Sequence, residues 1–174
     1  MTPDAVTPRI VAIETAVPET ALPQDAARDM LARQPGLSRL GARLVATAFD
    51  SSGIEQRHTV IEGLATGEES VLVAPDGTIR PATTGERNAL YARYAPELAI
   101  RAARRALASA RVEPAEVTHV ITASCTGFVS PGPDLAIVHE LGLATTTPRL
   151  HVGFMGCAAA FPALRTADAL CRAD

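Results

Sequence analysis

The chain has 174 residues, of which 47% are hydrophobic and 20% charged. A chain of this length can bury about 70% of its unfolded surface as one globular domain, which excludes intrinsic disorder. All 16 basic residues are arginine, and 19 acidic residues leave a net charge of −3. Proteins that bind a phosphate backbone are typically basic, so nucleic acid is not an expected partner. The core must be built from Ala, Val, Leu and Ile, because aromatic residues make up only 3% of the chain.

The cysteine count also narrows the class of protein. The three cysteines, Cys125, Cys157 and Cys171, form no CxxC pair, so neither a disulfide framework nor a zinc ribbon is expected. On one helix, Cys157 and Cys171 would lie about 21 Å apart, which is too far for a disulfide. The sequence contains no run of 18 uncharged apolar residues. We therefore expect a cytoplasmic protein without a membrane span.

The first half of the chain alternates short extended and helical patterns. A β-branched run at 9–15 predicts a strand, and the prolines at 18 and 23 indicate a loop between them. Apolar periodicity predicts helices over 24–33 and 37–49, separated by Pro-Gly. We expect a turn and extended chain over 50–60, then a loop region over 63–85 with one possible strand at 71–73.

The second half is more regular. Apolar residues at successive i+4 steps predict an amphipathic helix over 86–111, despite Pro96. The nearly continuous apolar run at 117–125 predicts a strand buried on both faces. A helix over 134–142, a strand over 149–155 and a final helix complete the pattern. This order predicts an α/β fold with a parallel or mixed sheet covered by helices.

Cys157 is the strongest candidate for chemistry. It follows Gly156 where a strand passes into a helix, and a helix N-terminus stabilises a thiolate. Gly156 permits a tight turn, and the alanines after Cys157 leave space for a substrate. Taken alone, a cysteine among alanines is more often a small buried core residue. Pro162 predicts that the regular helix begins near Ala159 or is kinked.

The other two cysteines have weaker signals. Cys125 closes a predicted strand, and ligands bind at strand ends in α/β sheets, so it could line the same pocket as Cys157. A buried core cysteine is an equally good interpretation of Cys125. Cys171 lies in the last helical turn without an obvious base, and we interpret it as structural.

The sequence lacks the motifs that several other kinds of site require. The four histidines, His58, His119, His139 and His151, have no metal-site spacing. His151 is six residues before Cys157 and could act as its base, although a partly exposed strand histidine is the better interpretation. Dinucleotide, Walker-type and serine-hydrolase motifs are absent from the sequence.

Two segments together carry a resemblance to a known family. THVITASCTGFVSPG at 118–132, followed after a helix by RLHVGFMGCAAAFPALRTA, resembles the type III polyketide synthases of the chalcone and stilbene synthase group, bacterial members above all. SGIEQRH at 52–58 and the helix over 84–107 extend the resemblance over most of the chain. It implies a thiolase-like layered fold, with residues 1–174 forming an incomplete N-terminal domain and no second domain.

The resemblance also implies roles for residues. Cys157 matches the nucleophile that accepts an acyl group from a coenzyme A thioester before condensation with malonyl-CoA. Cys125 and Thr126 match positions that line the substrate cavity, and Ser130 matches a residue that reaches toward the partner's cavity across a homodimer. Gly127, Pro131 and Gly132 are expected to define the backbone of the turn after Cys125, and Gly156 that of the turn before Cys157. No cofactor is expected beyond the acyl-CoA and malonyl-CoA substrates.

Some family features are missing. The His and Asn that activate the thioester, and the gatekeeper Phe, belong to a later half of the family's chain. Arg43 and Arg57 lie near the coenzyme A region without matching its basic residues. We therefore expect this chain alone to be inactive in condensation. Two alternatives stay open: a non-catalytic truncated fragment or pairing module, and a ketoacyl-synthase-like priming enzyme of fatty-acid synthesis.

Overall fold

The computed structural model describes residues 7–173. These residues form two compact units. One unit spans Val17–Glu86, and the other combines residues 7–16 with residues 87–173. We call the second the cysteine unit, because it contains all three cysteines.

The Val17–Glu86 unit is a two-stranded antiparallel sheet with three helices. Strand β1 (Thr20–Pro23) pairs with β2 (Gln56–Thr59), and three helices complete the unit: α1 (Gln24–Ala32), α2 (Arg39–Asp50) and α3 (Gly63–Thr66). The Ser38 hydroxyl caps α2 by accepting a hydrogen bond from the Gly41 amide. Both predicted helices are confirmed, as is the break between them, where Gly36 adopts a φ of +81°.

Three predictions for this half are wrong or incomplete. Residues 9–15 form no strand, because they pair with no other strand within residues 7–173. The loop predicted between the two prolines instead contains β1, which obtains its partner from β2. The region 63–85 includes the short helix α3, and its predicted strand is reduced to an isolated bridge between Val73 and Ile79.

The cysteine unit follows the predicted strand and helix order. After α4 (Thr84–Ala110) and a 3-10 turn, η1 (Pro114–Glu116), come β3 (Val120–Ser124), α5 (Pro133–Glu140) and β4 (Arg149–Gly153). The chain ends with a second 3-10 turn, η2 (Gly156–Ala159), and α6 (Ala160–Ala173). Strands β3 and β4 pair in parallel, as expected for an α/β fold. Pro133 begins α5, and Gly142, with a φ of +68°, ends it.

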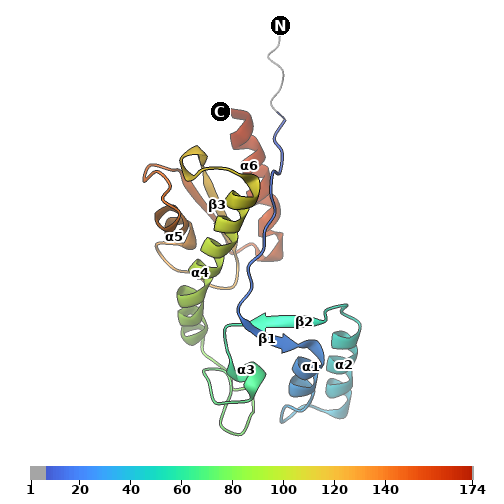
Figure 1. The fold of residues 1–174 in the computed structure, drawn as a ribbon. Helices are drawn as coiled ribbons and strands as arrows, with labels where there is room; N and C mark the ends of the chain where they lie inside the picture. The colour runs from blue at the N-terminus through green and yellow to red at the C-terminus, as the bar shows by residue number, and fades with distance from the viewer. Residues whose placement is uncertain (1–6, 174) are drawn as a thin grey trace. The chain divides into compact units, whose positions relative to one another are not determined.

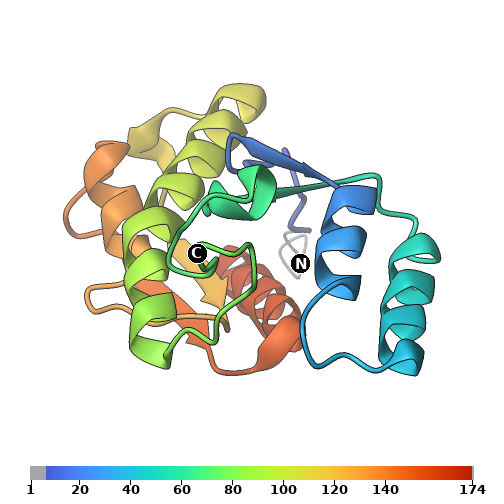
Figure 2. The same ribbon diagram turned by 90° about the horizontal axis from the view of Figure 1, so that it is seen from below.

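Helices lie on both faces of the β3–β4 sheet (Figures 1 and 2). The core cluster of Val120, Ile137, Val138 and Leu143 joins β3 to α5, and apolar residues of α4 pack against it. Ile121, on the opposite face of β3, lines a cavity together with Ala167 and Leu170 of α6. The sheet thus separates α4 and α5 from α6.

One prediction about β3 is wrong. Of its five residues only Val120 is buried, and Ala123 is exposed. In residues 7–173, β3 has a single strand neighbour, so its apolar run is not covered on both faces along its whole length. The continuous apolar run thus predicted the strand correctly, but it did not predict how much of the strand is exposed.

Candidate active site

The site lies where two neighbouring parallel strands end. The register pairs Ser124 with Gly153, so the residues that follow the two strands leave the same edge of the sheet. Cys125 follows directly after β3, and Cys157 comes four residues after the end of β4. The sheet therefore brings the two predicted cysteine segments together at one edge.

The connection from β4 to Cys157 is a tight turn. Phe154 and Gly156 have φ values of +60° and +63°, a region that few side-chain-bearing residues adopt. Cys157 is exposed in η2, and the regular helix α6 begins only at Ala160, as Pro162 predicted. The interpretation of Cys157 as a buried core cysteine is therefore wrong. Between Val152 and Leu164 the sequence carries no charged residue, so the thiol stands in an apolar segment.

The connection from β3 to α5 contains the other predicted cavity residues. Cys125 is exposed, so its interpretation as a core residue is also wrong. The turn continues through Thr126 to the cis peptide bond between Ser130 and Pro131. Gly132 lies against the carboxylate of Asp134, and an added Cβ would come within 2.3 Å of Oδ1. A side chain at 132 would therefore have to displace this carboxylate.

An ion pair between a buried carboxylate and a partly exposed arginine fixes the end of that turn. Asp134 has only 6% of its surface exposed, and it accepts a hydrogen bond from Arg149 Nη1 at the beginning of β4. A buried carboxylate requires such a partner, because desolvation otherwise destabilises its charge. The pair ties α5 to β4, the strand that leads to Cys157.

An aromatic contact joins the two connections. The rings of Phe128 and Phe154 have centroids 6.3 Å apart and are tilted by 44°. Phe128 belongs to the turn after Cys125, and Phe154 precedes Cys157 by three residues. Both are exposed, Phe154 to 85%. The edge of the sheet therefore presents an apolar rim beside the two thiols.

In this structure the His151 ring has a hydrogen-bond partner other than Cys157. Its Nδ1 lies 2.8 Å from the Thr122 hydroxyl on the neighbouring strand. Among the hydrogen bonds described for residues 7–173, none joins His151 to Cys157. The interpretation of His151 as an exposed strand histidine is confirmed.

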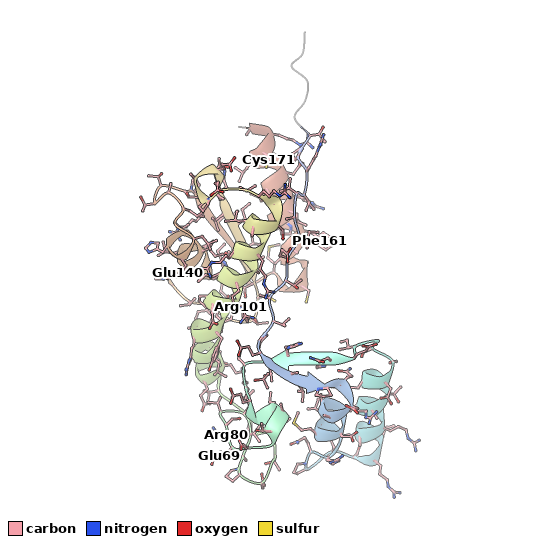
Figure 3. The ribbon with its side chains drawn as sticks, in the orientation of Figure 1. Glu69, Arg80, Arg101, Glu140, Phe161 and Cys171 are labelled. Carbon is pink, nitrogen blue, oxygen red and sulfur yellow. The ribbon has the colours of Figure 1, made fainter. Side chains whose placement is uncertain are left out.

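The remaining candidates lie elsewhere. Cys171 is exposed near the end of α6, whereas Phe161 lies near its beginning (Figure 3). A cavity of about 410 Å³ is lined by Cys171, His119 and Ile121 of β3, among others. In the other unit, Arg57 lies over the Phe49 ring at 5.2 Å and donates a hydrogen bond to Gln24, while Arg43 is exposed on α2. Within residues 7–173, no group of three His, Cys, Asp or Glu side chains could hold a metal ion.

Sequence reasoning missed two residues of this region. Asn88 and Tyr91 on α4 contact the turn after Cys125, through the Phe128 amide and Gly127. The apolar pattern of α4 does not indicate these contacts, because the partners are 40 and 36 residues apart in the sequence. Gly127 was the one local signal, since a glycine inside a turn often marks a close approach.

The cysteine unit is an α/β fold, in which a parallel sheet lies between helices and a cysteine follows the strand-to-helix junction. The solved structures that it matches are type III polyketide synthases of the thiolase-like class. The family described as chalcone and stilbene synthases, N-terminal domain, matches residues 4–174. The chain therefore belongs to the chalcone and stilbene synthase family, the type III polyketide synthases.

Individual relatives agree with this assignment. The chain is 46% identical over 93 residues to the alpha-pyrone synthesis polyketide synthase-like Pks18 of Mycobacterium tuberculosis, covering 53% of this chain and 24% of that protein. It is 30% identical over 156 residues to 1,3,6,8-tetrahydroxynaphthalene synthase of Streptomyces griseus, covering 90% of this chain and 38% of that protein. The crystal structure of PKS-I from the brown alga Ectocarpus siliculosus matches with a TM-score of 0.85 and 25% identity, covering 100% of this chain and 46% of that one.

The matches cover only part of each relative. The chain spans less than half the length of these proteins. Among the described residues, no helix has both the length and the apolar character needed to cross a membrane.

Proposed function

We propose that the chain carries the nucleophile of an acyltransferase that loads a starter acyl group for polyketide synthesis. In this proposal the Cys157 thiolate attacks the carbonyl carbon of an acyl-CoA thioester. The bond between that carbon and the coenzyme A sulfur breaks, and coenzyme A leaves as its thiol after taking up a proton. The observation that carries the proposal is the exposed Cys157, held after Gly156 at the edge that Cys125 shares.

Condensation would follow on the loaded thiol. Malonyl-CoA loses carbon dioxide, and the resulting carbanion attacks the Cys157 thioester carbonyl. The thiolate of Cys157 is released, and the acyl chain, two carbons longer, stays on coenzyme A. Stabilisation of the thioester oxyanion is usually the largest catalytic contribution. The family supplies it from a His and an Asn beyond this sequence, so we propose that residues 1–174, as part of an N-terminal domain, load but do not condense.

Substrates and assembly form part of the same proposal. Acyl-CoA thioesters are the proposed partners, with no cofactor, and Ser130 would act across a homodimer. The uncharged segment around Cys157 and the rim of Phe128 and Phe154 support an apolar acyl group.

A second candidate is a non-catalytic module that pairs with a synthase subunit. Its support is the exposed apolar surface of the cysteine unit, where Ile10, Val11 and Ile13 are each at least 70% exposed. Such surface commonly marks an interaction site. A module of this kind would bind the fluorescent dye ANS and form no acyl adduct.

Intact-mass spectrometry separates the two candidates. The purified chain is incubated with hexanoyl-CoA, and Cys157→Ala and Cys171→Ala are treated in parallel. We expect one acyl adduct on the wild type and on Cys171→Ala, and none on Cys157→Ala. An adduct that persists in Cys157→Ala, or none on any of the three proteins, contradicts the loading proposal.

A further inference from the structure

The turn after β3 is held by a hydrogen bond from outside its own segment. The Phe128 amide donates to Asn88 Oδ1 at 2.8 Å. Asn88 is half-buried on α4, forty residues earlier in the chain. Phe128 itself is exposed, so this backbone contact, rather than burial of the ring, fixes the amide.

Tyr91 contacts the neighbouring residue of the same turn. A Cβ added to Gly127 would lie 2.2 Å from Tyr91 Cγ and 2.6 Å from both Cδ atoms. The tyrosine ring therefore lies directly against the glycine backbone, and no other residue fits at 127. Asn88 and Tyr91 are three residues apart, so they share one face of α4. Together they hold two consecutive residues of the turn.

The held turn is connected to both proposed thiol positions. Cys125 and Thr126 immediately precede Gly127, and the Phe128 ring contacts Phe154, three residues before Cys157. A displacement of Phe128 would move the apolar rim beside Cys157 as well as the segment of Cys125. We propose that Asn88 and Tyr91 are positioning residues that set the orientation of the turn 125–132 and so determine how an acyl thioester is seated at Cys157. The effect on acyl seating rests on the proposed function.

Thiol reactivity tests the positioning without requiring catalysis. Each cysteine is alkylated with iodoacetamide, and its rate is obtained by peptide mass mapping, with Cys171 as the internal reference. Loss of one hydrogen bond changes an equilibrium about fivefold, so Asn88→Leu should raise the Cys125 rate about fivefold relative to Cys171. Asn88→Asp keeps an oxygen acceptor and should restore the wild-type ratio. Tyr91→Ala should act like Asn88→Leu, and Tyr91→Phe, which keeps the ring, should not.

A matched control and two contrary outcomes complete the test. Tyr94, also half-buried on α4, packs with Arg93, so Tyr94→Ala should leave the Cys125 ratio unchanged. An unchanged ratio in Asn88→Leu and Tyr91→Ala overturns the proposal. Equal acceleration of all three thiols also overturns it, because that pattern indicates general unfolding.

Acyl loading provides the second measurement. In Asn88→Leu, we expect the hexanoyl-CoA concentration for half-maximal loading to rise about fivefold, with the maximal rate unchanged. A fall in the maximal rate alone would contradict a role in seating the thioester. If the alkylation ratios change as expected but the wild type forms no adduct, the positioning role stands and the loading function fails.

Discussion

The two units differ in what holds their elements together. In the cysteine unit, β3 and α5 meet through the apolar cluster of Val120, Ile137, Val138 and Leu143. In the Val17–Glu86 unit, Leu22, Ala27 and Val73 are buried, and a buried polar side chain, Gln24, with 8% of its surface exposed, adds directed contacts between elements. Its amide donates to the Phe49 carbonyl and to the Ser52 hydroxyl and accepts from Arg57.

The two kinds of interaction fix different parts of each unit. The apolar cluster fixes the layers of the cysteine unit while the sheet edge with Cys125 and Cys157 stays exposed. Apolar packing is not directional, so it stabilises layers without specifying individual groups. The Gln24 amide instead joins the end of α2 to β2 through directed hydrogen bonds. Substitutions in the two regions should therefore differ in how much they change the free energy of unfolding and in the kind of interaction that they remove.

The largest effect is expected at the apolar cluster. Ile137→Ala removes a side chain with 8% exposure and leaves a cavity, so the free energy of unfolding should fall by about 2–5 kcal/mol. Leu164→Ala, at a position 57% exposed, is the matched control and should change it by less than about 0.5 kcal/mol. Urea unfolding measures both. Equal effects would contradict the assignment of the core to this cluster.

The next largest effect on stability is expected at the ion pair between Asp134 and Arg149 in the cysteine unit. Asp134→Asn removes the charge that Arg149 meets at the beginning of β4. Hydrogen bonds to charged groups contribute about 1.5–3 kcal/mol, and the partly exposed arginine places the loss toward the lower value. The control is Glu140→Gln, an exposed acid at the end of the same helix. If both variants unfold at the same urea concentration, the pair does not stabilise the unit.

The sequence predicts those parts of the structure that depend on residues close together in the chain. Helices α1, α2, α4 and α5 follow from apolar periodicity and from local caps such as Ser38 and Pro133. The strand predicted over 9–15 fails and β1 was missed, because a strand forms only with a partner. The partner of β1 is β2, which lies more than thirty residues later in the chain.

The same distinction holds at the site. The position of Cys157 after a strand and a glycine is local, so the sequence predicts the junction, including the delayed start of α6. The meeting of the two strand ends follows once β3 and β4 are parallel neighbours. The contacts of Asn88 and Tyr91 depend on how α4 packs, which no pattern within α4 encodes.

The third prediction concerns the Gln24 amide. Gln24→Leu keeps the volume but leaves the guanidinium of Arg57 and the Phe49 carbonyl without this partner. We expect a loss of about 1–3 kcal/mol in the free energy of unfolding, with weakened amide-exchange protection where β2 begins. Gln56→Leu, an exposed glutamine on β2, is the matched control. A neutral Gln24→Leu would show that apolar packing alone holds both units.

The smallest effect compares exposed ion pairs of the two units in acid. Hydrogen bonds from Arg28 lower the pKa of Asp29 in α1, and those from Arg172 lower the pKa of Asp168 in α6. Because the folded-state pKa is depressed, each carboxylate stabilises the fold above the ordinary aspartate pKa of 3.8, and this contribution is lost as the pH falls through the lowered value. Asp29→Asn and Asp168→Asn should therefore lower the thermal midpoint slightly at about pH 6, and this difference should shrink as the pH falls toward about 2. Asp29 should show the larger change, because Arg28 also bridges to Asp50 on α2, whereas Asp168 and Arg172 lie within one helix. An equal shift at both pH values would mean that packing, and not charge, carries the effect.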